Sequence, residues 1–100
     1  MSLSIEIPYG QIEVFCKRRP IKSLAFFGSV IRNDFGPDSD IDVLVEFEDD
    51  ARIGFFELGR MERELSELLN GRVDLNTPNS LSPYFRDQVL KEAEVQFDAS

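Results

Sequence analysis

The stretch GSVIRNDFGPDSDID, residues 28–42, joins two apolar runs of the sequence. Residues 21–27 form a short run rich in aromatic and branched side chains, which predicts a buried strand. Residues 29–34 leave room for one or two helical turns with Ser29 as N-cap, and residues 35–39 carry turn-forming side chains. Residues 41–47 alternate between two faces and predict a second strand, in which Asp42 shares a side with Asp40.

The flanking segments add helices and one more strand. Residues 9–19 have apolar side chains at helical spacing and basic residues at their end, and residues 53–70 show a clear amphipathic stripe before Gly71, where a left-handed helix end is expected. Residues 72–77 alternate as a third strand, and residues 82–93 predict a last helix with Phe85 and Val89 in its apolar stripe. The pattern indicates an α/β (α+β) fold in a single domain, residues 1–100, with three strands.

Composition limits the classes of function. The chain has 100 residues, 42% of them hydrophobic and 30% charged, as expected of one ordinary globular domain. Its net charge of −8 disfavours a broad nucleic-acid-binding surface and favours partners with basic patches. No apolar run is long enough to span a bilayer and the first ten residues do not resemble a signal peptide, so we expect a cytoplasmic protein.

Cys16 is the only cysteine, and the chain contains no histidine. A disulfide framework, a structural zinc site and a Cys/His nucleophile are therefore disfavoured. We interpret Cys16 as a core residue.

Three polar features converge on one edge of the predicted sheet: the Gly28-Ser29 turn, the Asp40/Asp42 pair and Asp74. A turn of small residues between a strand and a helix lets backbone N–H groups and a hydroxyl approach a phosphate. Each feature also has a purely structural interpretation, because Gly-Ser is a common tight turn and exposed aspartates are common surface residues. Their combination is less easily explained in this way, since it would crowd like charges on an already acidic domain.

The aspartates suit a divalent cation. Carboxylates two residues apart on a strand point the same way, about 6 to 7 Å from each other, and repel unless a positive charge lies between them. Magnesium takes hard oxygen ligands and leaves positions for water and substrate phosphates. Asp74, from a neighbouring strand, makes a site for two ions possible, with Asp40, Asp42 and Asp74 as both metal ligands and catalytic residues.

The spacing of Gly28-Ser29 and Ser39-Asp40-Ile41-Asp42 resembles the signature of the polymerase-beta-like nucleotidyltransferases, in particular the minimal nucleotidyltransferase (MNT) domain. The resemblance covers almost the whole chain and implies the nucleotidyltransferase fold, a small mixed three-stranded sheet with helices packed on it. It further implies that Gly28 and Ser29 hold the triphosphate of ATP, with Arg32 and Ser39 as further nucleotide-site residues. Asn33 departs from the pattern, because many relatives have glycine there.

The resemblance also implies that Asp40 and Asp42 bind two magnesium ions and that Asp74 completes the site and helps to deprotonate the acceptor. Stand-alone minimal domains pair with helical HEPN toxins, so the implied function is an antitoxin that attaches AMP to a tyrosine of its partner. The alternative is a non-catalytic antitoxin that neutralises its partner by occlusion.

Four aromatic residues leave the subunit arrangement open. They can form a contact in a homo-oligomer, but we expect most of them to pack in the core: Phe55, Phe56, Tyr84 and Phe85.

Overall fold

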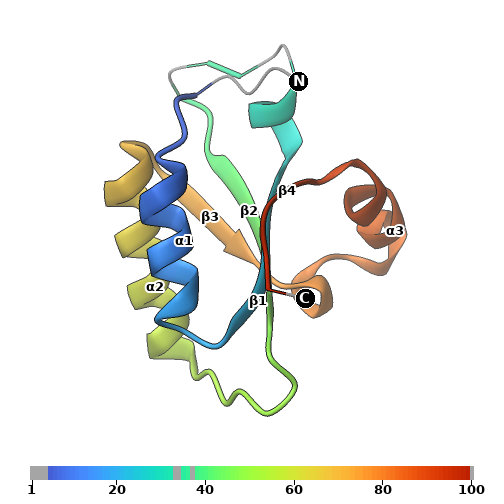
Figure 1. The fold of residues 1–100 in the computed structure, drawn as a ribbon. Helices are drawn as coiled ribbons and strands as arrows, with labels where there is room; N and C mark the ends of the chain where they lie inside the picture. Colours follow the sequence, from blue (N-terminus) through green and yellow to red (C-terminus); the bar gives the residue numbers. More distant parts are fainter. Residues whose placement is uncertain (1–4, 33–34, 37, 100) are drawn as a thin grey trace.

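A computed structural model describes residues 5–32, 35–36 and 38–99 and shows a four-stranded sheet with helices on both faces. Helices α1 and α2 lie on one face, and α3 lies on the other (Figure 1). The elements, in chain order, are α1 (Tyr9–Lys17), β1 (Ile21–Phe27), the 3₁₀ helix η1 (Gly28–Ile31), β2 (Ile41–Phe47), α2 (Phe55–Leu69), β3 (Val73–Asn76), the 3₁₀ helix η2 (Pro78–Ser80), α3 (Pro83–Glu92) and β4 (Glu94–Asp98).

The sheet is mixed, and its strand order is β3-β2-β1-β4. Strand β1 pairs antiparallel with both β2 and β4, whereas β2 and β3 are parallel and joined through α2. The three predicted strands are confirmed within a residue or two. A fourth strand, β4, was missed by the sequence-based prediction, although Val95 and Phe97 alternate with polar residues there in the pattern of a strand.

The hydrophobic core lies between the sheet and the helices α1 and α2. Strand residues such as Phe26 and Val43 pack there against the apolar stripes of the two helices, represented by Ile12 and Leu65, all at most 1% exposed. Cys16 is fully buried in this core, as predicted. Burial raises the pKa of its thiol to about 12, which leaves it unreactive in the folded protein.

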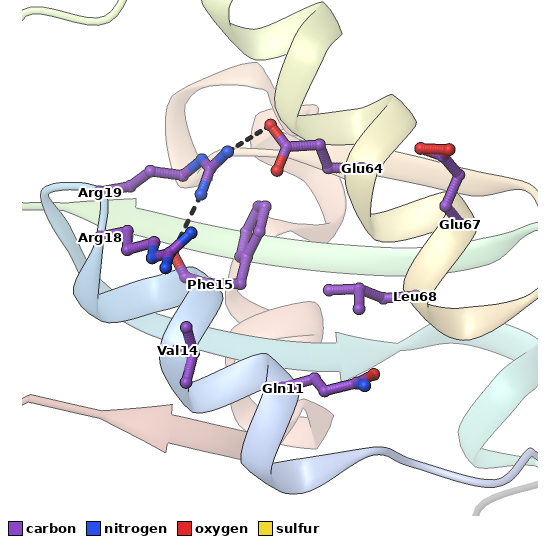
Figure 2. Close-up of a pocket in the computed structure, with 8 residues that line it drawn as sticks. All are labelled: Gln11, Val14, Phe15, Arg18, Arg19, Glu64, Glu67 and Leu68. Carbon is purple, nitrogen blue, oxygen red and sulfur yellow. Dashed lines mark hydrogen bonds and ion pairs between the residues drawn. The ribbon is translucent and has the colours of Figure 1, made fainter.

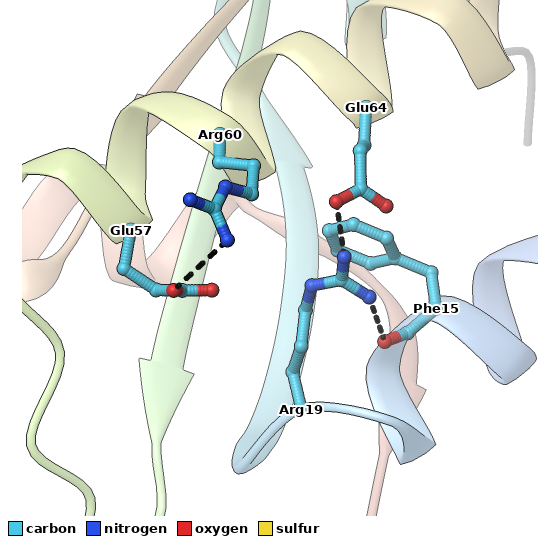
Figure 3. A network of polar contacts seen from close by, with 5 residues as sticks. All are labelled: Phe15, Arg19, Glu57, Arg60 and Glu64. Atoms are coloured by element: carbon cyan, nitrogen blue, oxygen red, sulfur yellow. Dashed lines mark hydrogen bonds and ion pairs between the residues drawn. The ribbon is translucent and has the colours of Figure 1, made fainter.

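A partly buried arginine links α1 to α2 on the outside of the core. Arg19, which follows α1, forms an ion pair with Glu64 of α2 and donates a hydrogen bond to the Phe15 carbonyl oxygen (Figure 3). Its guanidinium carbon also lies 4.2 Å from the centre of the Phe15 ring. Together these contacts fix the end of the first helix against the second.

The ends of two helices differ from the prediction. Helix α2 ends at Leu69, and the residue that follows it in the left-handed conformation is Asn70, with φ 54°, and not Gly71. Asparagine tolerates this conformation better than most residues, and Gly71 has a different role: a Cβ there would lie 2.9 Å from Cδ1 of Ile41. The turn after β1 is the four-residue η1, its N-cap position belongs to Phe27, and no side chain caps it in this described segment.

Helix α3 and the exposed aromatic residues also differ from the prediction. None of the ten residues of α3, all of them described, is buried, so its apolar stripe does not join the core. Most of the four aromatic residues were expected in the core, but all four are exposed, by 86% for Phe55, 88% for Phe56, 94% for Tyr84 and 56% for Phe85. The sheet with α1 and α2 already forms a closed core, and α3 packs only lightly beside it.

No helix within the described residues is both long and apolar enough to cross a membrane.

Candidate active site

Asp42 and Gly28 form the centre of the candidate site. Phe27, the last residue of β1, is the register partner of Asp42 on β2, which brings the turn at Gly28 alongside the carboxylate. Gly28 has φ +75°, and a Cβ added to it would overlap Oδ2 of Asp42 and lie 3.1 Å from its Cγ. The turn therefore requires glycine both for its backbone conformation and for the close approach of the carboxylate.

Asp74 lies beside Asp42 on the neighbouring strand. The two residues are register partners in the parallel pair β2–β3, so their side chains project from the same face of the sheet. Partial burial, followed by the charges of Asp74 and Asp40, raises the pKa of Asp42 from 3.8 to about 6, and the positive charge of Arg32 partly opposes this shift. In its protonated form Asp42 donates a hydrogen bond to Asp74, which raises its pKa further.

Two side chains of α2 hold the strand that carries Asp74. The backbone N–H of Leu75 donates to Glu62 Oε2 at 2.9 Å, and the N–H of Val73 donates to Ser66 Oγ at 3.1 Å. These donors face away from β2 on the edge strand, and the side chains of α2 satisfy them. Glu62 and Ser66 are positioning residues that the sequence-based prediction missed, because their role depends on the docking of α2 against β3.

Asp40 precedes β2 and lies on the same side of the chain as Asp42. Its Oδ1 is 3.1 Å from Nε of Arg72, which precedes β3 in the same register. Both side chains are largely solvent-exposed, at 47% for Asp40 and 77% for Arg72, so this ion pair contributes little to stability. It does give the Asp40 carboxylate a cationic partner in the protein.

Asp42 and Asp74 therefore share one face of the sheet, and Asp40 lies immediately before β2. A common metal site formed by all three aspartates stays a prediction. Within residues 5–32, 35–36 and 38–99, however, no three acidic or thiol side chains already converge closely enough to enclose a metal ion. The donor set still fits magnesium, which often binds through one or two carboxylates and takes its other ligands from water and substrate phosphates. Burial, followed by repulsion from Asp74 and Asp40, raises the pKa of Asp42, and a bound cation would offset both effects by favouring the ionised carboxylate.

A cavity of about 320 Å³ opens beside Asp42 on the side of β1. Gly28, Arg32 and Asp42 line one wall, and Phe85, Gln88, Val89 and Glu92 of α3 line the other. The sequence predicted the first wall but not the second, because nothing in the spacing of α3 shows which surface its apolar stripe faces.

Ser29 and Ser39, the two serines of the predicted nucleotide site, lie in different parts of the structure. Ser29 lies within η1 next to Gly28. Ser39 accepts a hydrogen bond from the Gly36 N–H at 3.0 Å and lines a separate cavity with Ile41 and Gly71. Asn33 lies outside the described residues. Ser39 therefore braces the loop that leads to Asp40, and the cavity beside Asp42 does not include it.

A groove of about 460 Å³ between α1 and α2 lies on the other face of the sheet (Figure 2). Its walls carry the Arg19–Glu64 ion pair together with apolar side chains such as Val14 and Leu68. The acidic side chains of this groove come from α2, and the groove shares no residue with the cavity beside Asp42. Because none of the predicted site residues lines the groove, we place the candidate site at Asp42.

Known proteins resemble this chain over most of its length. The model of the nucleotidyltransferase domain family matches residues 10–95. A provisionally named protein adenylyltransferase of Methanocaldococcus jannaschii is 41% identical over 73 residues, which are 73% of this chain and 76% of that protein. The protein adenylyltransferase MntA of Thermococcus cleftensis is 38% identical over 77 residues, which are 76% of this chain and 75% of that protein.

Solved structures give the same result for the fold. A provisionally named minimal nucleotidyltransferase superimposes with a TM-score of 0.70 at 35% identity, covering 85% of each chain. A toxin–antitoxin complex with AMP-PNP reaches 0.74 at 19% identity, covering 94% of this chain and 76% of that one. A complex of tri-AMPylated Shewanella oneidensis HEPN toxin with MNT antitoxin reaches 0.65 at 19% identity, covering 91% and 70%.

The last two likenesses show the fold alone, whereas the family match over residues 10–95 covers the strands that carry Asp42 and Asp74. The chain belongs to the nucleotidyltransferase domain family, and its relatives in that family include protein adenylyltransferases.

Proposed function

We propose that this chain is a magnesium-dependent protein adenylyltransferase, which transfers AMP from ATP to a tyrosine of a HEPN toxin partner and so acts as an antitoxin. The observation that carries the proposal is the Asp42–Asp74 pair, which stands side by side on two neighbouring strands next to the glycine turn. The names of the relatives support the reaction. The structural neighbours, one with AMP-PNP and one with an AMPylated HEPN toxin, support the nucleotide and the partner.

In this proposal the glycine turn holds the triphosphate. The first N–H groups of a helix have no partner within that helix, and those of Gly28 and Ser29 begin η1 beside Asp42. Arg32 lines the same cavity and supplies positive charge near the phosphates. Ser39 contributes indirectly, by bracing the loop before Asp40.

Asp40, Asp42 and Asp74 would hold the magnesium, which would supply positive charge to neutralise the phosphates and the leaving group. The hydroxyl oxygen of the acceptor attacks the α-phosphorus of ATP and forms a new P–O bond, while the bond to the bridging oxygen of pyrophosphate breaks. The hydroxyl proton passes to a carboxylate. We assign the role of this base to Asp74, because its side chain is exposed to an incoming acceptor. Pyrophosphate leaves with the electron pair of the broken bond.

The test is to weigh the intact partner after incubation with this chain, ATP and magnesium. We expect the wild type to add the mass of one or more AMP groups, with pyrophosphate as the second product. Asp42→Asn and Asp74→Asn should add none, and peptide mapping should locate the AMP on tyrosine. Arg63→Ala, an exposed change on the outer side of α2, serves as the control and should behave as the wild type.

An unmodified partner would contradict the enzymatic proposal. If the same partner is nevertheless neutralised by the wild type and by Asp42→Asn alike, the chain acts by occlusion. Omitting magnesium, or replacing ATP by GTP, tests the metal and the nucleotide in the same assay.

Three further expectations belong to this proposal: one catalytic domain over residues 1–100, a cytoplasmic location, and self-association through exposed aromatic residues. The pair Phe55 and Phe56, in edge-to-face contact with ring centres 6.2 Å apart, supports a protein contact at the start of α2. Light scattering on the wild type and on Phe55→Ser tests the self-association.

A further inference from the structure

One face of α3 lines the cavity beside Asp42. Its contributing residues are Phe85, Gln88, Val89 and Glu92, which follow the i, i+3, i+4, i+7 spacing of a single helical face. The opposite wall carries Gly28, Arg32 and Asp42. The cavity therefore joins the proposed phosphate and metal site directly to a helix face that carries two apolar and two polar side chains.

This helix face does little for folding. Phe85 remains 56% exposed, and none of the described residues of α3 is buried. The helix is instead tethered by polar contacts: Arg86 Nε donates to the Pro78 carbonyl oxygen at 2.7 Å, its Nη2 donates to that of Leu81 at 3.1 Å, and Ser82 caps the first turn. An aromatic ring presented to a cavity without a packing role is available to a ligand.

The polar groups on this face have a defined hydrogen-bonding pattern. Gln88 Nε2 donates to Glu92 Oε1 at 3.1 Å, which orients the Gln88 amide. Its carbonyl oxygen and its second amide hydrogen then form an acceptor–donor pair. This is the pattern that a glutamine offers to adenine in a bidentate pair, whereas guanine presents two acceptors on the corresponding edge.

We propose that this face of α3 is the nucleobase site, in which Phe85 stacks on the base and Gln88 selects adenine over guanine. The inference rests on the proposed function, since it assumes that a nucleoside triphosphate binds at Gly28 and Asp42. Glu92 reinforces the selection by holding the amide and by repelling the guanine carbonyl oxygen.

The order of the strands places the nucleobase and the acceptor hydroxyl on opposite sides of β2. Gly28 follows β1 and the cavity lies on that side of Asp42, whereas Asp74 lies on β3, on the other side of β2. Asp74 does not line the cavity. An acceptor hydroxyl that reaches Asp74 therefore approaches from the β3 side, and the cavity remains for the nucleotide.

The test measures binding by calorimetry with magnesium present and no acceptor. The probes are AMP-PNP, its guanosine counterpart and inorganic tripolyphosphate. We expect the wild type to bind AMP-PNP about tenfold more tightly than the guanosine analogue. Phe85→Ala should weaken both nucleotides about tenfold and leave tripolyphosphate unchanged, because stacking involves only the base. Gln88→Ala should bring the two nucleotides within about threefold of each other.

Tyr84→Ala is the matched control, since Tyr84 is the adjacent aromatic residue, 94% exposed and outside the cavity. It should change none of the three affinities, and neither it nor Phe85→Ala should lower the melting temperature. Equal binding of both nucleotides by the wild type, or full affinity in Phe85→Ala, would overturn the nucleobase site while leaving the proposed reaction standing. A wild type that binds none of the three probes would remove both.

Discussion

The backbone of Gly28 lies so close to the carboxylate of Asp42 that a single methyl group at position 28 would overlap Oδ2. The contact joins the end of β1 to the start of β2, which are neighbours in the sheet. The turn proposed to hold phosphate and the carboxylate proposed to hold metal are thus one structural unit, and a change in either should affect both.

Gly28→Ala should therefore damage stability and activity together. The left-handed φ of +75° disfavours alanine and the added Cβ displaces Asp42, so we expect a loss of about 2 kcal/mol in urea unfolding and no measurable AMP transfer. Gly59→Ala is the control, because a Cβ there meets nothing within 4 Å and lies on a helix, where alanine stabilises by about 1 kcal/mol. Normal activity in Gly28→Ala would show that the close contact is unimportant.

Asp42→Asn should change how stability depends on pH. The pKa of Asp42 is about 6 in the folded protein, against 3.8 ordinarily, so the folded state retains a proton that the unfolded chain has lost. This contribution is complete below pH 3.8, declines as the pH rises through 6 and is absent above it. Without magnesium, the wild type should lose about 1 kcal/mol relative to Asp42→Asn between pH 4 and 7, a value reduced for solvent screening.

Parallel urea titrations of the two proteins at several pH values check this expectation. Asparagine can still donate a hydrogen bond to Asp74, so the variant should be at least as stable as the wild type at pH 7. Magnesium should raise the melting temperature of the wild type and have little effect on the variant. A large loss of stability in Asp42→Asn at pH 7 would mean that the carboxylate is structural.

Arg72→Gln should alter metal binding more than folding. Arg72 pairs with Asp40 at 3.1 Å, but both side chains are largely exposed, so the free energy of unfolding should change by less than about 0.5 kcal/mol. Removing this competing cation should tighten magnesium binding about twofold to fivefold, measured by calorimetry at low ionic strength. Weaker magnesium binding in the variant would show that the pair instead prepares Asp40 for the ion.

Glu62→Ala should disturb Asp74 without touching it. The variant removes the acceptor for the Leu75 N–H next to Asp74, and we expect a loss of about 1 to 2 kcal/mol in stability and a clear loss of AMP transfer. Glu62→Gln retains an acceptor oxygen and should restore most of both. Glu67→Ala, exposed on the same helix, controls for the change in charge. Full activity in Glu62→Ala would contradict a positioning role.

Arg19→Ala and Arg60→Ala form a matched pair on the α1/α2 side (Figure 3). Arg19 is only 17% exposed and contacts Glu64 and Phe15, so its loss should cost about 2 kcal/mol in denaturant unfolding. Arg60 is 69% exposed and lies 4.0 Å from Glu57, so its loss should cost less than about 0.5 kcal/mol. Similar values for the two variants would contradict this distinction between a partly buried arginine with several contacts and an exposed one.

Periodicity was a reliable guide wherever a segment belongs to the main core. Ile41–Phe47 alternates between two environments, and the structure buries Ile41 and Val43 while Asp42 remains accessible. The stripe of α2 buries Met61 and Leu65 as predicted. Such patterns are local consequences of burying one face of an element, so they can be read before the partner of that face is known.

The same reasoning was wrong for α3. Its apolar stripe has helical spacing, but Phe85 faces a cavity at the candidate site and not the core. Periodicity identifies a face of a helix and does not identify what covers that face.

What the amino-acid order determined on its own is the set of elements and the chemical character of residues 28–42, because strand period, turn residues and carboxylate spacing are local properties. Tertiary structure alone decided which groups meet. The parallel register of β2 and β3 places Asp42 beside Asp74. Glu62 accepts a hydrogen bond from the backbone of β3, and α3 forms one wall of the cavity. These contacts join segments far apart in the chain, so they depend on how whole elements pack and on no pattern within any one of them.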